Sequence, residues 1–287
     1  MKEKFRKIII CSIQEYVRKI CSARFLGVAV LVVALVCSMV VGIDQLMMDT
    51  NEWITPWMAP HFFSNIYFIT FYGFIVCYMY SDVPFFNRAE LYKILREGRR
   101  VWCVEKMISI VLQAFTLVSF TMLVSVLAFV PKLKFEWDWG RIIYTMAFSG
   151  NMYEYDLTGT FPVIITKYTP VQAMLLCFFM VGLVSSMMGL LMFAVSLYGN
   201  RILAVSVAAV LTGLNLSGVK FITAAWLTYV LPFYWCRINI YEQQICPGRY
   251  GRSLSFYATL CSILIVVLVL AILLRSRRIE YVWNKEE

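Results

Sequence analysis

Six long apolar stretches, none with an Asp, Glu, Lys, Arg or His in its interior, constrain this chain more than any other feature. A transmembrane α-helix takes about 20 mostly apolar residues. With 61% hydrophobic and only 15% charged residues, the chain has too few polar side chains to cover this much apolar surface in water. The sequence therefore predicts an all-α integral membrane protein with six transmembrane helices. The predicted spans are Phe25–Ile43, Phe63–Tyr80, Met107–Val130, Val171–Leu197, Ile202–Ser217 and Phe256–Leu274.

The segment before the first span, residues 1–24, has its own pattern. Apolar residues recur there at helical spacing, while the charged residues Lys4, Lys7, Glu15, Arg18 and Lys19 lie mostly off that stripe. The stripe consists of Phe5, Ile8, Ile9, Ile13, Tyr16 and Ile20. This pattern is typical of an amphipathic helix in the membrane interface, and a plain cytoplasmic tail is the weaker alternative. We expect two units, this interfacial helix and a six-helix membrane domain over residues 25–287.

Basic residues set the expected orientation. With six spans both termini lie on one side, and that side carries 18 of the 26 Lys and Arg residues. The positive-inside rule places it in the cytoplasm, so we expect a multi-pass protein of the cytoplasmic membrane. Topology and attraction to anionic lipid account for the net charge of +9, and we expect no nucleic-acid partner.

The sequence offers few side chains that could act in catalysis or bind a metal. The single histidine, His61, is expected at the surface or interface of an outside loop, without the clustered ligands of a metal site. Ser185 and Ser186 have no His or Lys inside the membrane to activate them. We therefore expect no enzyme active site, metal or cofactor in this chain. No GxxxxGK[ST] phosphate loop is present, so uphill transport would take its energy from another protein.

One polar stretch between the second and third spans, "SDVPFFNRAELYKILREGRR", predicts a short capped helix. Asn87 is a good N-cap, and Glu90 three residues later completes a capping-box pattern. The helix is expected over 88–97, ending before Gly98 in a left-handed conformation. Leu91, Ile94 and Leu95 are expected on one side, as an apolar ridge. The alternatives are a connector resting on lipid phosphates and a rigid peg gripped by a cytoplasmic partner.

The architecture resembles permeases of the type 2 ABC exporter class. The shared features are an amphipathic N-terminal helix, six spans, a short helix between spans two and three, and an apolar segment broken at Pro232 before span six. Residue-level similarity is largely confined to 81–106. The resemblance implies export powered by a separate cytoplasmic ATPase that binds ATP and Mg, together with a second permease subunit, expected to be a homodimer. It also implies that a coupling helix contacts the ATPase. The expected coupling residues are Pro84, Phe85, Phe86, Asn87, Arg88, Glu90, Leu91, Tyr92, Ile94, Leu95, Arg96 and Arg100.

Small residues recur every four positions in two spans and allow close helix contact. They are Ala34, Ser38 and Gly42 in the first span and Ala209, Gly213 and Ser217 in the fifth. Packing within one subunit explains them equally well, but the resemblance favours a dimer face. Separately, Cys236 and Cys246 share the last outside loop, where a disulfide between them is one of the possibilities.

Two other function classes stay open. A non-transporting membrane module, such as a sensor, an immunity factor or an assembly scaffold, would use the same helices without an ATPase. A membrane enzyme ranks third, because the spans lack catalytic groups.

Overall fold

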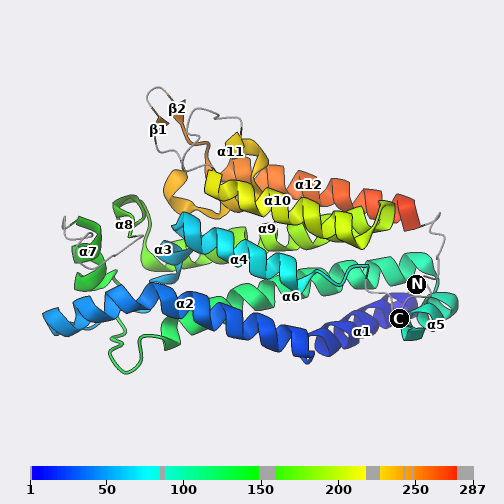
Figure 1. Ribbon diagram of the computed structural model, residues 1–287, viewed down its shortest axis with the longest axis horizontal. Coiled ribbons are helices and arrows are strands. Elements are labelled where there is room, and N and C mark those ends of the chain that lie inside the picture. Colours follow the sequence, from blue (N-terminus) through cyan, green and yellow to red (C-terminus); the bar gives the residue numbers. More distant parts are fainter. Residues whose placement is uncertain are drawn as a thin grey trace.

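Long helices run side by side along the whole molecule in the computed structural model (Figure 1). The structure describes residues 2–84, 88–148, 160–217, 227–241, 244–246 and 249–276. Six helices match the predicted apolar stretches. They are α2 (Ala23–Thr50), α4 (Ile66–Met79), α6 (Arg99–Leu127), α9 (Pro170–Tyr198), α10 (Arg201–Ser217) and α12 (Leu254–Arg275).

Four of these helices, α2, α6, α9 and α12, are long and apolar enough to cross a membrane. With 29 residues, α6 is about 43 Å long, well above the roughly 30 Å of a hydrocarbon core. The 14 residues of α4 reach only about 21 Å and the 17 of α10 about 25 Å. The multi-pass membrane character is therefore supported, while α4 and α10 are shorter than a full span.

The second predicted span is interrupted. Helix α3 (Ala59–Ser64) ends just before Asn65, which is extended, with ψ at 130°. Its side-chain Oδ1 then caps α4 by accepting from the backbone N–H groups of Tyr67 and Phe68. An asparagine that satisfies two backbone donors starts a new helix at low cost, which explains why 63–80 is two elements rather than one.

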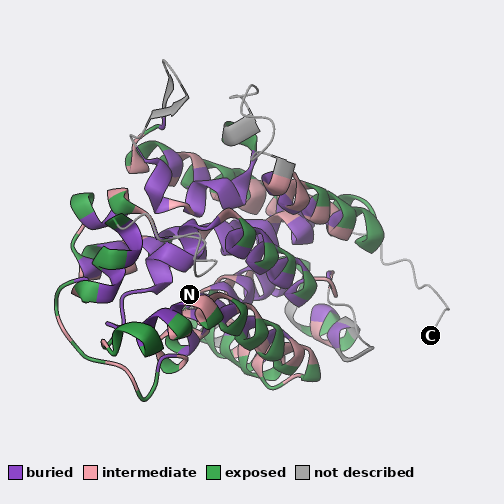
Figure 2. Ribbon diagram, turned by 60° about the vertical axis from the view of Figure 1, so that its left-hand side comes forward, coloured by how far each residue is buried: buried purple, intermediate pink, exposed green. Residues whose placement is uncertain are grey.

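Helix α9 lies at the centre of the bundle, in contact with α4, α6, α10 and α12. Buried residues concentrate along this centre, whereas the outer helices carry many exposed ones (Figure 2). Gly189 of α9 has no room for a side chain, because a Cβ there would lie 2.6 Å from Ile110 Cγ2 on α6 and 2.8 Å from the ring of Tyr80. Small residues thus bring α6 and α9 into close packing.

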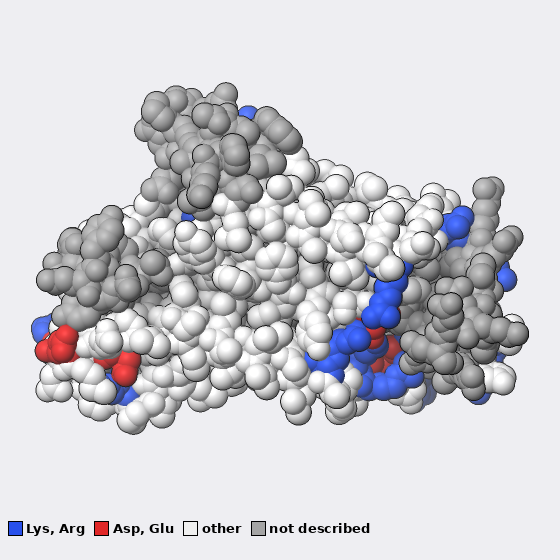
Figure 3. All heavy atoms as spheres, in the orientation of Figure 1, with Lys and Arg blue, Asp and Glu red and all other residues white. Residues whose placement is uncertain are grey.

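The molecule has two different ends. Helices α1 (Lys2–Ile20) and α5 (Arg88–Glu97) lie at one, here called the proximal end (Figure 1). The distal end carries α3 and several short elements. These are α7 (Gly140–Phe148), α8 (Pro162–Lys167), α11 (Leu227–Val230), the 3-10 helices η2 (Pro232–Cys236) and η3 (Ile238–Ile240), and the paired strands β1 (Gln244–Cys246) and β2 (Arg249–Tyr250). Figure 3 shows charged atoms at both ends of one face and a broad uncharged band between them, as a membrane-embedded surface requires.

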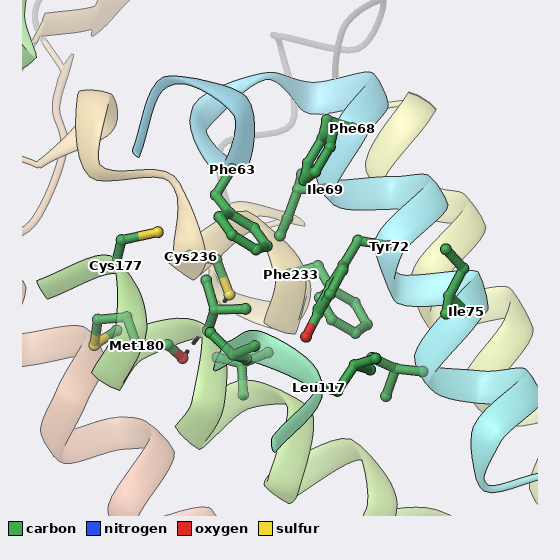
Figure 4. Packing of buried hydrophobic residues seen from close by; sticks show 14 of the residues in the cluster. Phe63, Phe68, Ile69, Tyr72, Ile75, Leu117, Cys177, Met180, Phe233 and Cys236 are labelled. Atoms are coloured by element: carbon green, nitrogen blue, oxygen red, sulfur yellow. Dashed lines mark hydrogen bonds between the residues drawn. The ribbon is translucent and has the colours of Figure 1, made fainter. Parts of the chain in front are cut away.

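The apolar segment before α12 is broken as expected, since η2 begins at Pro232 directly after α11 and Leu231. Its side chains pack into the bundle: Phe233 and Cys236 lie near Tyr72 of α4 and Met180 of α9 (Figure 4). The Cys236 thiol is free and buried, 4.0 Å from the backbone oxygen of Met180. Because Cys236 is a free thiol, the possible disulfide with Cys246, whose side chain lies outside the described residues, is not formed in this structure.

His61 is not a surface residue, contrary to expectation. It is fully buried on α3, where its ring packs edge-on against Trp139 at a centroid distance of 5.1 Å. Trp139, just before α7, and Phe161, just before α8, both contact His61, and the sequence around the histidine does not reveal these contacts with distant segments.

Candidate functional site

The candidate site is the attachment of α5 to the bundle at the proximal end. Five side chains from three helices form it, and we call this cluster the α5 junction. They are Glu15 and Arg18 of α1, Glu90 of α5, and Trp102 and Lys106 of α6. Helix α6 contributes Trp102 and Lys106 from its first two turns, which precede the apolar stretch and carry polar residues.

Helix α1 contributes through its polar side. Ser12 and Glu15 are buried against the protein, and the hydroxyl groups of Tyr16 and of Thr116 on α6 are hydrogen-bonded at 2.7 Å. The opposite side exposes Ile9, Ile10, Ile13 and Val17. A helix that buries its polar side and exposes its apolar side needs an apolar surrounding, and a membrane interface provides one.

Two carboxylates and two cations form ion pairs with one another inside the α5 junction. Lys106 contacts Glu15 and lies 3.3 Å from Glu90 Oε2, while Arg18 contacts both carboxylates. The indole Nε1 of Trp102 donates to Glu90 Oε2 at 2.7 Å. Glu15, Glu90 and Lys106 are almost completely buried. The four charges cancel, so the cluster is neutral as a unit, which makes its burial tolerable.

The protonation state of Glu90 follows from these contacts. Burial alone would raise the pKa of Glu90, but the charge of Lys106 and the hydrogen bonds from Arg18 and Trp102 outweigh it and lower the pKa to about 2. The carboxylate is therefore ionised at neutral pH and holds α5 to both α1 and α6. In addition, Lys93 of α5 pairs with the buried Glu105 of α6 at 2.6 Å.

The segment leading into α5 is also tied down. Asp82 pairs with Lys19 at the end of α1 and, at 2.9 Å, with Arg24 at the start of α2. Arg201 at the start of α10 donates from Nε to the backbone oxygen of Ser81 at 2.7 Å. Helices α1, α2, α6 and α10 are thus all connected to α5 or to the segment that enters it.

The far side of α5 points away from the bundle. The side chains of Tyr92 and Leu95 are 77% and 83% exposed, and Arg96 is exposed beside them. At the end of the helix, Gly98 has a φ of 92° and Arg100 is exposed. Gly98 thus ends α5 with a positive φ, as a glycine allows, but its ψ of 149° lies outside the left-handed helical conformation that was predicted. The result is a short helix with one anchored side and one side free for contact.

The predicted ridge on α5 needs a correction. Ile94 is buried against the bundle while Leu95 is exposed, so these two residues do not form one ridge on the same side. The carboxylate of Glu90 accepts from Arg18 and Trp102, and the capping box with Asn87 stays a prediction because Asn87 lies outside the described residues. Pro84 is partly exposed. Phe85, Phe86 and Asn87 lie outside the described residues, as do the side chains of Arg88 and Leu91.

The small residues proposed for a dimer face differ in how far they are exposed. On α2, Ala34 and Ser38 are exposed and Gly42 is partly buried. On α10, Ala209 and Gly213 are partly buried, and a Cβ on Gly213 would lie 3.7 Å from Phe74 of α4 in the same chain. The side chain of Ser217 lies outside the described residues. The α2 positions are thus open to a partner, while Gly213 already packs within the subunit.

Sequence reasoning missed four members of the α5 junction, namely Glu15, Arg18, Trp102 and Lys106. The available signal was weak: a Glu-Lys pair at the edge of a span, and a carboxylate on the polar side of an amphipathic helix. In the described part of the chain, no group of His, Cys, Asp or Glu side chains is arranged to hold a metal ion.

Comparison with known proteins gives no relative. No family model matches the chain, and no curated protein or solved structure matches it. The functional conclusion therefore depends on the geometry of the α5 junction and on the resemblance noted in the sequence.

Proposed function

We propose that this chain is the membrane permease subunit of an ATP-driven transporter of the ABC class, an exporter whose energy comes from a separate cytoplasmic ATPase. The single observation that supports this proposal most is that α5 is anchored on one side and exposed on the other. It is anchored on one side by the buried α5 junction and offers Tyr92 and Leu95 on the other. An exposed apolar side chain next to a tyrosine, on a helix held rigidly by its back, suits a groove on another protein.

In this proposal the proximal end faces the cytoplasm and both termini lie there, in agreement with the distribution of Lys and Arg. Helices α2, α6, α9, α10 and α12 each cross the membrane, and α3 with α4 together form the remaining crossing. Helix α1 lies in the inner interface. The ATPase holds ATP and Mg, and this chain contributes no catalytic group.

The coupling mechanism follows from the contacts of α5. When the ATPase moves α5, Glu90 transmits the displacement through Arg18 to α1 and through Lys106 to α6. Asp82 and Ser81 transmit it to α2 and α10. Buried ion pairs resist separation, because a stranded charge is costly, so the proximal ends of these helices move with α5 rather than slip past it. In a dimer, such movement in both subunits would open a path between them.

Copurification tests the proposal. The chain is expressed with the ABC ATPases of its source, and the ATPase that copurifies is identified and its hydrolysis measured. Tyr92→Asp and Leu95→Asp should abolish association, because each puts a charge into an apolar contact. Trp137→Asp is the matched control, since Trp137 is 72% exposed but at the distal end. An ATPase that still binds both α5 variants normally would rule out the coupling role of α5. Complete absence of an ATPase would favour a non-transporting module.

A further inference from the structure

Arg237, between η2 and η3 at the distal end, is a partly buried cation. Its Nε donates to the backbone oxygen of Ser64 on α3 at 2.8 Å, and its guanidinium lies 5.4 Å from the ring centroid of Tyr234. Among the described residues no carboxylate forms an ion pair with it. A guanidinium offers five N–H donors, so one carbonyl and one ring leave most of this capacity unused.

Two further donors lie on α3, whose Ser64 contacts this cation. The hydroxyl of Ser64 is fully buried and has no hydrogen-bond partner among the described residues. Nδ1 of His61 accepts from the backbone N–H of Phe161 at 3.3 Å, which assigns the ring hydrogen to Nε2, and Nε2 also has no partner in that part of the chain. Positions three apart share a face of a helix, so both donors lie on one side of α3. Buried donors without an acceptor are rare and call for an explanation.

The segments next to α3 carry further polar and positively charged groups. Helices α3 and α8 both contact η3. Asn239 of η3 is buried with its side-chain Oδ1 unpartnered, and an amide can present its NH₂ group by a half-turn. Lys167 at the end of α8 donates to the backbone oxygen of Tyr241 at 3.1 Å, which brings another positive charge to this part of the distal end. Within the described residues, this set of donors lacks an acceptor with negative charge.

We propose that the distal end binds a phosphate-type oxyanion, with Arg237 as its charged ligand and Ser64 and His61 as neutral donors. The planar guanidinium fork matches two phosphate oxygens, and hydrogen bonds to a charged acceptor are stronger than those between neutral groups. Arg237 is only partly buried, so the anion has a route to it. The phosphate is either the headgroup of an anionic phospholipid or a soluble ion. This site is independent of the proposed transport function.

Binding to the purified full chain tests the site. The protein is placed in nanodiscs of phosphatidylcholine with or without phosphatidylglycerol, and retained lipid is counted by native mass spectrometry. Inorganic phosphate is titrated separately and followed by thermal shift. Arg237→Gln should weaken binding at least tenfold. The matched control is Arg141→Gln, because Arg141 also lies at the distal end but is exposed and paired with Glu52 at 3.1 Å.

If Arg237→Gln fails to fold, Ser64→Ala provides a second test of the anion site. The Ser64 hydroxyl has no partner in the part of the chain that the structure describes, so its removal should leave the melting temperature unchanged or raised while weakening anion binding severalfold. Binding of phosphatidylglycerol alone would identify a lipid headgroup, and binding of inorganic phosphate would identify a soluble anion. The proposal is overturned if wild type binds neither, or if Arg141→Gln loses as much binding as Arg237→Gln.

Discussion

Lys106 of α6 and Glu15 of α1 form an ion pair whose side chains are only 2% and 4% exposed. The pair joins two helices that are 91 residues apart in the chain, and Glu90 lies on the other side of the same ammonium group. This places a charged contact where an apolar one would ordinarily pack. It fixes how α1, α5 and α6 are oriented relative to one another.

Replacing Lys106 by Met should destabilise the proximal end strongly. Both carboxylates would stay buried with only Arg18 to neutralise them, and breaking a buried ion pair from one side costs about 3–5 kcal/mol. Thermal unfolding in detergent measures the loss. Lys134→Met is the control, because its pair with Glu136 is exposed and such pairs contribute about 0–1 kcal/mol. Equal losses in the two variants would show that the α5 junction is not a coupled unit.

The attachment of α5 should weaken in acid. The pKa of Glu90 is lowered from its usual 4.5 to about 2, so its stabilising contribution is complete above about pH 4.5 and is lost as the pH falls through 2. Wild type should therefore lose stability over this interval more steeply than Glu90→Gln, in melts followed at successive pH values. Glu136→Gln should keep the wild-type profile. If Glu90→Gln keeps it too, the assignment of this dependence to Glu90 is wrong.

Gly189→Ala should disturb the packing of α6 on α9. The added methyl group would approach Ile110 to 2.6 Å, and overpacking of this kind costs about 1–3 kcal/mol. The melting temperature should fall. At Gly199, in contrast, a Cβ meets nothing closer than 3.5 Å, so Gly199→Ala should have little effect. A tolerated Gly189→Ala would mean that α6 and α9 separate more easily than their contacts indicate.

The proposed dimer predicts crosslinking through α2. In a background with Cys21 and Cys37 replaced by Ser, Ala34→Cys should form a disulfide-linked dimer in membranes on mild oxidation, because Ala34 lies on the exposed small-residue face. Val33→Cys is the matched control, since Val33 is also exposed but points about 100° away around the helix. Equal crosslinking at both positions would indicate random collision rather than an interface.

Local features of the fold were predictable, because their causes are local. Apolar runs located the helices α2, α4, α6, α9, α10 and α12, and Gly98 marked the end of α5. What the sequence did not predict depends on contacts between distant segments. The partners of Glu90 on α1 and α6 were missed because they are far away in sequence. Ile94 and Leu95 were placed together because the junction, rather than the pattern within α5, sets how this short helix is rotated. His61 was assigned to the surface because the sequence around it does not indicate that Trp139 and Phe161 pack against it.

The long sequence separation inside the α5 junction has a consequence for biogenesis. Glu15 is synthesised early, yet it has no counter-ion from α6 until that helix has entered the membrane and presented Lys106. Under the proposed function, the exposed side of α5, which would face the ATPase, therefore takes its final orientation only after α6 has been inserted. A ribosome-bound or truncated chain that lacks α6 would not offer this surface, so we expect it not to recruit the proposed ATPase.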